Sequence, residues 1–293
     1  MGNPVYHLKP GDHRWPTELD VIEAPPKELW IRGDVDRLPE QPRVAIVGSR
    51  APSPYGLDQA RHFAFRLASQ GVSIVSGLAR GIDQAAHQAA LEAGGTTLAV
   101  LGSGVDRPWP DGELARRIAT EGVLVSEFPP GSSPRRHHFP RRNRLISGLA
   151  DTVVVIEAAH ASGSLITAHW AADQGKQVYA LPGRVDHPMS RGCHRLLREG
   201  AQLIEDPGEV LVELGLEAPP ESSPSESSSK QQPSDPLLRC LVGETLNANE
   251  LSMRVGRVVE EVLGELVQHE LDGRIIRGPG GLYRLARSIR GNK

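Results

Sequence analysis

The residues of this chain that could bind an anion are glycines, serines and arginines placed directly after short apolar segments. Backbone N–H groups in such loops, together with the positive end of a following helix, attract phosphate, and glycine lets the phosphate approach closely. The candidate residues are Gly48, Ser49, Arg50, Gly77, Arg80, Gly81, Ser162, Gly163 and Ser164. One such loop is weak evidence, because glycine also makes ordinary tight turns. Several of them together predict a phosphate-binding site.

A second candidate is the basic segment 135–144, which holds five arginines and two histidines and no acidic residue. The alternative is a solvated charged face, but such faces usually mix both signs of charge. The segment also contains Phe139, whose ring could receive a base while the arginines hold phosphates. The pattern therefore predicts a track for a polynucleotide.

Other chemical motifs are absent or incomplete in the sequence. Lys176 follows a glycine but lacks the rest of a P-loop, and Gly102 begins a Gly-x-Gly that lacks the third glycine of a dinucleotide-binding loop. Cys193 and Cys240 lie far apart, and the histidine pair 137–138 has no third ligand in sight. No Ser/His/Asp arrangement is evident. We therefore expect no metal and no cofactor.

The composition excludes several classes of protein. There are 33 Lys and Arg against 36 Asp and Glu, a formal net charge of -3, which argues against a uniformly basic nucleic-acid coat or a polybasic membrane protein. A local basic patch is still compatible with that balance. No apolar run approaches the roughly 18 residues of a membrane span, and the N-terminus lacks the features of a signal peptide. We expect a cytoplasmic protein.

The candidate loops must be positioned by a parallel sheet. From residue 44 onward, short segments that are apolar on both faces alternate with helical patterns, which is typical of parallel strands covered by helices on both sides. Strands are expected at 44–47, 72–75, 96–101, 122–126, 152–156, 177–181 and 201–204, and helices at 55–70 and 83–93. The carboxyl ends of parallel strands meet at one edge, so the glycine-rich loops should come together there.

Composition divides the chain into four expected parts. Residues 1–43 are a proline-punctuated lead-in packed on the next domain, 44–216 form a doubly wound α/β domain, and 217–236 form a flexible linker rich in Ser and Pro. Residues 237–293 follow the order helix, helix, helix and two strands, which predicts a small winged-helix domain. Its third helix, at 257–270, carries glutamates on its polar face, which disfavours major-groove reading. Weak backbone contact and protein docking stay open, and we favour docking.

Five motifs occur in an order that resembles the bacterial DNA-processing protein A (DprA/Smf) family. They are VAIVGSR at 44–50, SGLARGID at 76–83, FPxRNRxISGL at 139–149, SGSLITA at 162–168 and LPG at 181–183. The resemblance covers about residues 4–215. It implies an extended Rossmann-like fold and a protein that is not an enzyme. It also implies sequence-independent binding of single-stranded DNA, which the family protects during natural transformation and loads with the RecA recombinase, displacing single-strand binding protein.

The resemblance also implies roles for particular residues. Arg50 is the arginine of the first loop, Phe139 is the aromatic residue of the base pocket, and the basic residue just before it is Arg135 or Arg136. The Arg-Asn-Arg triplet of the family corresponds to Arg142, Asn143 and Arg144, of which Arg144 could equally be structural. Family members form homodimers through the end of the Rossmann-like domain. Candidate apolar positions there are Leu196, Leu197, Ile204, Val210, Leu211 and Leu214, although periodicity alone does not separate such an interface from the core.

The sequence departs from the family at two places. Many relatives begin with a helical module, and we expect it to be absent here because the lead-in starts close to residue 1. The family's Tyr-Pro after the third strand is Trp109-Pro110 here, followed by Asp111 where some relatives have a basic residue. We expect one phosphate contact to be lost at that position.

Two other functions stay open. A nucleotide phosphoribohydrolase of the lysine-decarboxylase-like group would use a similar sheet and a glutamate near a glycine-rich loop, a place that Glu157 could fill. The Pro-Gly-Gly-x-Gly-Thr run of that group is absent, however. A winged-helix transcription regulator with a ligand-sensing α/β domain would instead require sequence-specific binding of duplex DNA.

Overall fold

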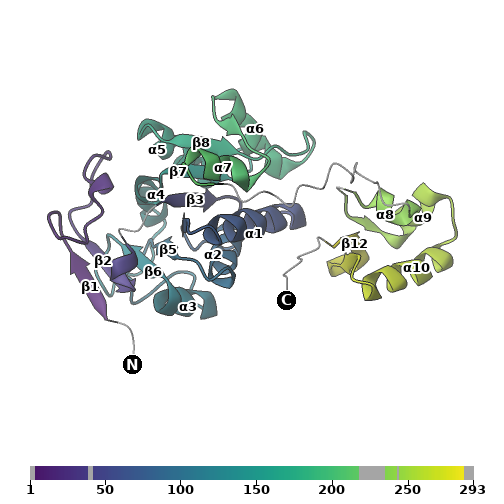
Figure 1. Ribbon diagram of the computed structural model, residues 1–293, viewed down its shortest axis with the longest axis horizontal. Helices are drawn as coiled ribbons and strands as arrows, with labels where there is room; N and C mark the ends of the chain where they lie inside the picture. The colour runs from purple at the N-terminus through teal and green to yellow at the C-terminus, as the bar shows by residue number, and fades with distance from the viewer. Residues whose placement is uncertain (1–3, 39–41, 218–234, 243, 287–293) are drawn as a thin grey trace. The chain divides into compact units, whose positions relative to one another are not determined.

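The computed structural model describes residues 4–38, 42–217, 235–242 and 244–286 (Figure 1). The chain divides into two compact units, Met1–Pro219 and Pro220–Lys293, and each is described by itself. The predicted linker at 217–236 lies almost wholly outside the described residues.

The described part of the first unit is built on a nine-stranded sheet in the order β1-β2-β6-β5-β4-β3-β7-β8-β9. The strands are β1 Val5–Leu8, β2 Leu29–Gly33, β3 Arg43–Val47, β4 Ser73–Ser76, β5 Thr97–Val100, β6 Val123–Ser126, β7 Thr152–Val155, β8 Gln177–Ala180 and β9 Gln202–Leu203. Strands β3 to β9 pair in parallel, as predicted. The chain moves outward from β3 through β4, β5 and β6 and then returns to β7 on the other side of β3. This reversal is where doubly wound sheets bind ligands.

The lead-in extends the sheet, which the sequence pattern did not predict. Strand β2 pairs antiparallel with β6, and β1 pairs antiparallel with β2. In β2, Leu29 and Ile31 are buried while Trp30 and Arg32 are half-buried, the alternation of a strand with one face on the core. The alternation spans only five residues and is surrounded by prolines, so it is not recognised as a strand from the sequence.

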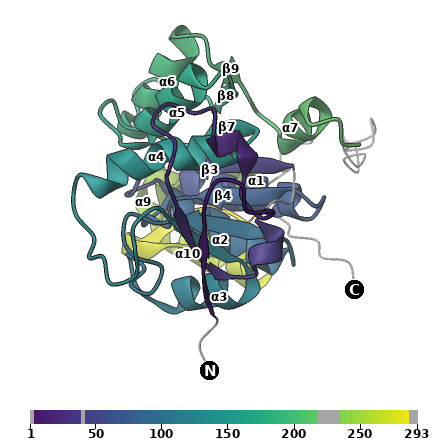
Figure 2. The same ribbon diagram turned by 90° about the vertical axis from the view of Figure 1, so that its left-hand side faces the viewer.

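Helices cover both faces of the sheet. They are α1 Pro54–Ala68, α2 Ile82–Glu92, α3 Glu113–Glu121, α4 His138–Leu149, α5 Ser164–Asp173, α6 Arg191–Arg198 and α7 Pro207–Glu213. Helices α1, α2 and α7 share one apolar cluster, and α4, α5 and α6 share another with the lead-in. Figure 2 shows α1 and α4 on opposite sides of β3. The doubly wound α/β architecture predicted from the sequence is therefore confirmed.

Most of the apolar positions considered for a dimer interface lie in this unit's own core. Leu196 is 4% exposed, and Ile204, Val210 and Leu211 are fully buried. Leu197 and Leu214 are half-buried against the same clusters. Their periodic spacing therefore reflects the packing of α6 and α7 on the sheet rather than a free apolar face.

The second unit is a winged-helix domain. Its elements are α8 Pro236–Cys240, β10 Leu246–Asn247, α9 Ala248–Val255, α10 Val259–Leu271, β11 Ile275–Arg277 and β12 Leu282–Leu285, with strand order β10-β12-β11. Asn247 begins α9 with a capping box to Glu250. The polar face of α10 carries Glu261 and Glu265, which pair with Arg257. Within the described ranges, no helix is long and apolar enough to cross a membrane.

Candidate nucleic-acid interface

An open cleft of about 390 Å³ lies where the strand order of the sheet reverses, at the carboxyl ends of β3 and β7. The loop after β3, the start of α4 and the loop that leads into α5 form its walls. Nine of the predicted site residues line it: Gly48, Ser49, Arg50, Phe139, Arg142, Asn143, Ser162, Gly163 and Ser164. The other predicted residues, Gly77, Arg80, Gly81, Arg135, Arg136 and Arg144, lie outside its lining.

The loop after β3 is fixed by its neighbours. The Ser49 N–H donates to the carbonyl of Glu157 at 2.7 Å, and the Ser49 hydroxyl accepts from the Ala51 N–H at 3.1 Å. A Cβ at Gly48 would lie 2.7 Å from a side-chain carbon of Ile82. Gly81 has a φ of +87°, and a Cβ there would overlap the Ser49 carbonyl. These glycines are therefore required by the close packing of the loops, which the sequence pattern attributed to phosphate.

Arg142 lines the cleft but is 3% exposed, and the hydrogen bonds of its guanidinium lie inside the protein. Its side chain donates to the carbonyl of Gly77 at 2.7 Å and to that of Val100. The carboxylate of Asp83 balances its charge and accepts from the Gly77 N–H at 3.1 Å. Burial lowers the pKa of Arg142 to about 10, so the group is still cationic at neutral pH. The same burial raises the pKa of Asp83, and Arg142 opposes that rise. Arg142 thus joins α4 to the ends of β4 and β5.

Phe139 lies close to two arginines at the cleft. Its ring centroid is 5.9 Å from the guanidinium carbon of Arg50 and 6.0 Å from that of Arg142. The half-buried ring packs over Gly102, where a Cβ would lie 2.9 Å from a ring carbon. The nearby cations and the Gly102 backbone packed against the ring hold the aromatic surface in one orientation. The exposed arginine is Arg50, which can reach a bound phosphate beside the ring.

The loop before α5 places a helix N-terminus at the cleft. The Asn143 amide donates to the Gly163 carbonyl at 3.1 Å, which fixes this loop to α4. The hydroxyls of Ser162 and Ser164 are hydrogen-bonded at 2.8 Å. Gly163 is the N-cap residue of the helix and offers no side chain to its first N–H groups. The N–H groups of Leu165 and Ile166 donate to the carbonyls of Ser162 and Gly163, and the Ser164 N–H lies 3.4 Å from the Ser162 hydroxyl. The attraction of this helix end for an anion therefore comes from the helix dipole and the two hydroxyls rather than from free N–H groups.

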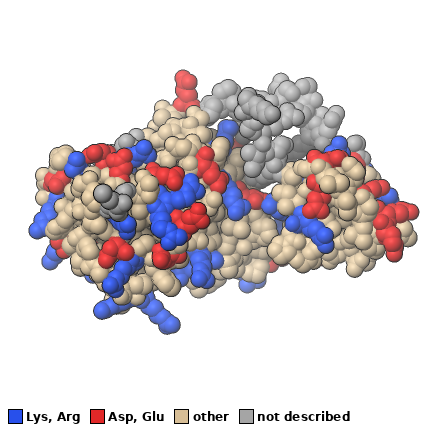
Figure 3. All heavy atoms as spheres, turned by 90° about the horizontal axis from the view of Figure 1, so that it is seen from below, with Lys and Arg blue, Asp and Glu red and all other residues tan. Residues whose placement is uncertain are grey.

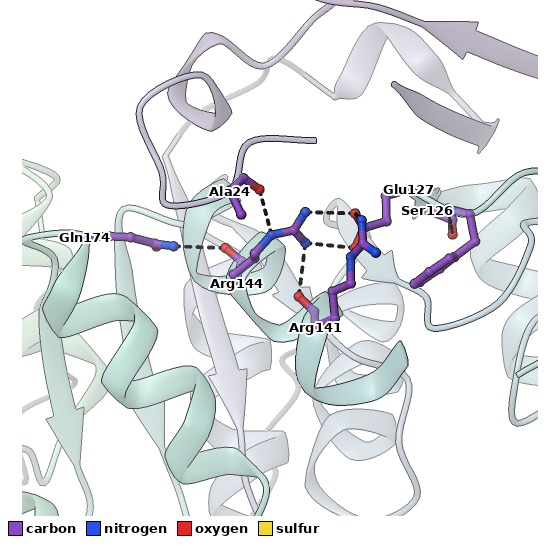
Figure 4. A network of polar contacts seen from close by, with 7 residues as sticks. Ala24, Ser126, Glu127, Arg141, Arg144 and Gln174 are labelled. Carbon is purple, nitrogen blue, oxygen red and sulfur yellow. Dashed lines mark hydrogen bonds and ion pairs between the residues drawn. The ribbon is translucent and has the colours of Figure 1, made fainter. Parts of the chain in front are cut away.

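Arg144 is buried and hydrogen-bonded inside the protein, which favours the structural role that the sequence left open for it. It is 3% exposed. Its guanidinium donates to both carboxylate oxygens of Glu127 at 2.8 Å and to the Ala24 carbonyl at 2.9 Å (Figure 4). Arg141 joins the same carboxylate at 3.0 Å. Because these donors are occupied inside the protein, Arg144 fastens α4 to the lead-in and to the end of β6.

The exposed cations near the sheet edge are fewer than the basic segment suggested. Arg50, Arg80, Arg135 and Arg136 are exposed, and no ion pair links them to an acidic residue in the part of the chain that the structure describes. Over the face drawn in Figure 3, Lys and Arg are interspersed with Asp and Glu. The available positive charge is therefore local rather than spread over the molecule.

The glutamate considered for a phosphoribohydrolase is engaged elsewhere. The Glu157 carboxylate accepts from the backbone N–H of Ser53 at 2.9 Å and from its hydroxyl at 2.5 Å, at the N-terminus of α1. Glu157 is 4% exposed and is absent from the lining of the cleft. Its position assigns it to the joint between β7 and α1 rather than to substrate.

The paired histidines at the start of α4 do not form a metal site. His138 is buried and stacks on Phe128 at 4.0 Å, and its Nδ1 lies 3.1 Å from the Gly102 carbonyl. Burial lowers the pKa of His138. Among the described residues, no group of three or more His, Cys, Asp and Glu side chains is arranged to hold a metal.

Sequence reasoning missed some residues of the cleft. Met189 lines it, and its sulfur lies 3.3 Å from the Ser49 hydroxyl. Met189 follows β8 in the chain, so the rule that ligands meet the carboxyl ends of strands could have included it. The contribution of Asp83 depends on contacts between distant segments and left no local signal.

Two family models match the chain. The model of DNA recombination-mediator protein A matches residues 7–215, and that of the DprA winged helix domain matches residues 218–281. Among curated proteins, Protein Smf of Escherichia coli is 41% identical over 299 residues, which span 98% of this chain and 80% of that protein. DNA processing protein DprA of Streptococcus pneumoniae is 44% identical over 205 residues, 69% of this chain and 72% of that protein.

Two solved structures are similar to the chain. DprA from Streptococcus pneumoniae superposes with a TM-score of 0.67 at 41% identity, over 72% of this chain and 74% of that one. DNA processing protein A from Helicobacter pylori, described for its single-stranded DNA binding mode, superposes with a TM-score of 0.66 at 32% identity. That similarity covers 73% of this chain and 98% of the other.

Proposed function

The chain belongs to the DNA recombination-mediator protein A family, and from this we propose that it binds single-stranded DNA at the cleft where its sheet reverses. The observation that carries the proposal is the Phe139 ring held beside the exposed Arg50. A relative from Helicobacter pylori is described as a single-stranded DNA binder. We infer the same ligand class for this protein.

Each wall of the cleft has a proposed role. A base stacks on Phe139, and one phosphate pairs with Arg50. At the N-terminus of α5, the hydroxyls of Ser162 and Ser164 hold a second phosphate, which the positive end of the helix dipole favours. The exposed Arg80, Arg135 and Arg136 contact the strand outside the cleft. None of these contacts reads the hydrogen-bonding edge of a base, so binding is independent of sequence.

We propose further that the protein protects incoming strands during natural transformation and transfers them to the RecA recombinase without catalysing a reaction. The family's description as a recombination mediator supports the transfer. This work takes place in the cytoplasm, where the strand, RecA and single-strand binding protein meet. Base release from nucleoside monophosphates by the purified protein would contradict the absence of catalysis.

We also propose a homodimer through the end of the Rossmann-like unit. Strand β9 ends the described sheet, and its Leu203 is 47% exposed. Val212 on α7 is 66% exposed. We therefore assign the interface to Leu203 and Val212 rather than to the mostly buried positions that the sequence suggested. Light scattering of the wild type and of a Leu203→Glu variant tests the dimer, which the charge should dissociate.

Sequence independence is tested with labelled strands of equal length and different base composition. We expect affinities within a few-fold of one another for mixed and pyrimidine strands, and a common loss when Phe139→Ala is introduced. In a second assay, RecA filament formation is followed on strands coated with single-strand binding protein. The protein should accelerate it, and the Phe139→Ala variant should not. A strong preference for one sequence would contradict the proposed binding mode.

A further inference from the structure

The loop between β5 and α3 exposes an aromatic ring that lies outside the cleft. Trp109 in this loop is 52% exposed, more than any other aromatic side chain of the described residues. Trp15, by comparison, is 3% exposed. A single exposed ring is ordinary on a protein surface. Whether the Trp109 ring is a binding site depends on the rigidity of its loop and on the neighbouring side chains.

Hydrogen bonds fix this loop to the loop that follows β6. The Gly104 N–H donates to the Ser132 carbonyl at 2.9 Å. The Asp106 carboxylate accepts from the Gly131 N–H at 2.8 and 2.9 Å. Within the first loop, the Ser103 hydroxyl donates to the Arg107 carbonyl at 2.7 Å. A ligand of this surface would therefore bind a backbone that is already ordered, which lowers the entropic cost of binding.

The same two loops connect Trp109 to the base site. Strands β5 and β6 are parallel neighbours, so both loops leave the edge of the sheet at which the cleft lies. The loop after β5 begins near Gly102, and Gly102 lies directly under the ring of Phe139. The loop after β6 leads to the exposed Arg135 and Arg136. A DNA strand that leaves Phe139 along this edge would meet Arg107 and Trp109 on the first loop and Arg135 and Arg136 after the second.

The charges around Trp109 suit a nucleic acid strand. Arg107 is exposed, and its nearest described carboxylate, that of Asp106, is 4.0 Å away and holds the Gly131 N–H. Asp111 accepts from the adjacent Gly112 N–H at 2.8 Å but still carries a negative charge. Asp111 therefore weakens a phosphate contact near Trp109. It does not oppose the stacking of a base on the uncharged indole ring.

We propose that Trp109 is a second stacking platform for the same single-stranded DNA, with Arg107 holding the adjacent phosphate. This inference rests on the proposed function of the cleft. The ligand is an unpaired base of any identity, because every base offers a face to an indole ring. Bases inside a duplex stack on each other and do not offer that face.

The test compares short and long labelled strands bound to the full chain. A strand of about four nucleotides fills the Phe139 site, and one of about 16 also spans the loop, within the usual range of single-strand binding sites. The Trp109→Leu variant keeps an apolar side chain and loses stacking. It should bind the long strand about 5- to 150-fold more weakly and the short one unchanged. Trp109→Phe should retain most of the affinity, and Phe65→Ala, which removes an exposed ring from α1, is the matched control.

Two further readouts separate stacking from other effects. The long strand should quench tryptophan fluorescence in the wild type, and the quenching should fall strongly in Trp109→Phe. The dependence of affinity on salt should be the same in the wild type and in Trp109→Leu, because no charge is removed.

Wild-type affinity of Trp109→Leu for the long strand, with binding still weakened by Phe139→Ala, would overturn this inference and leave the function of the cleft intact. Unchanged quenching in Trp109→Phe would also overturn it. A wild-type protein that binds neither strand would contradict the proposed function itself.

Discussion

The role of each arginine near the sheet edge depends on whether its guanidinium faces water or the protein. Arg142 and Arg144 are each 3% exposed and donate to carbonyls or to Glu127. Arg50 is exposed and approaches only the Phe139 ring closely. An exposed arginine can exchange water for a phosphate at low cost, whereas a buried one would leave an unpaired partner behind. Single substitutions should therefore separate binding from stability.

Arg50→Ala should weaken binding of single-stranded DNA without changing the melting temperature. One lost phosphate contact lowers the slope of log affinity against log salt by about 0.7 for a single strand. Fluorescence anisotropy over a salt series measures that slope. Arg198→Ala removes an equally exposed arginine from α6 and is the matched control. An unchanged slope in Arg50→Ala would remove Arg50 from the interface.

His87 makes the stability of the fold depend on pH. Burial, with a further effect of Arg142, lowers the pKa of His87 to about 3, and its Nδ1 lies 2.7 Å from the Thr97 hydroxyl. The unfolded chain binds a proton near pH 6.5, whereas the folded chain does not until about pH 3. The free energy of unfolding should therefore fall by about 1.4 kcal/mol per pH unit below 6.5 on account of this group.

Urea denaturation at pH 7 and pH 5 measures this effect. The His87→Gln variant cannot titrate, so its loss of stability between the two pH values should be about 2 kcal/mol smaller than that of the wild type. Equal losses in both proteins would show that His87 is protonated in the folded state.

At the scale of elements, strands β3 to β8 could be predicted because each is apolar on both faces, as in Val44 to Val47 of β3. Helix α4 could not, because its sequence is basic and begins with a proline in its first turn. Its inward charges are satisfied by Gly77, Val100 and Glu127, which are distant in sequence. The local sequence does not reveal such distant partners. The basic segment is therefore interpreted as an exposed surface from the sequence alone.

Arg142→Ala tests this assignment of α4. The substitution leaves Asp83 buried without its cation and frees the carbonyls of Gly77 and Val100. We expect the free energy of unfolding to fall by about 3–5 kcal/mol, as when one partner of a buried pair is removed. Arg117→Ala, which breaks an exposed pair with Glu121, should leave the stability nearly unchanged. Wild-type stability combined with lost DNA binding would instead make Arg142 a direct ligand of the strand.

At the scale of the whole molecule, the net charge of -3 conceals local differences. Exposed arginines without acidic partners occur beside the cleft, whereas α10 of the winged-helix unit shows glutamates and exposed Leu263, Val267 and Leu271. Every candidate DNA contact lies in the first unit. We therefore expect the winged helix to contribute little to the affinity for single-stranded DNA.

A chain that ends near residue 216 should bind single-stranded DNA almost as tightly as the full chain. The sheet, its helices and all candidate contacts are retained, and only the winged-helix unit is lost. Mobility shifts of the two proteins at one salt concentration compare them. A loss of more than about tenfold, or 1.4 kcal/mol, would assign a DNA contact to the winged helix.

The preference for unpaired bases is the central claim, and one competition measurement tests it directly. The full chain is bound to a labelled single strand, and unlabelled single-stranded or duplex DNA of the same sequence is added. A base stacked on Phe139 contributes about 1–3 kcal/mol that a duplex does not offer, so the single strand should compete about 5- to 150-fold better. Phe139→Ala should remove the part of that difference that the Phe139 ring supplies. Equal competition by duplex and single strand in the wild type would contradict the account.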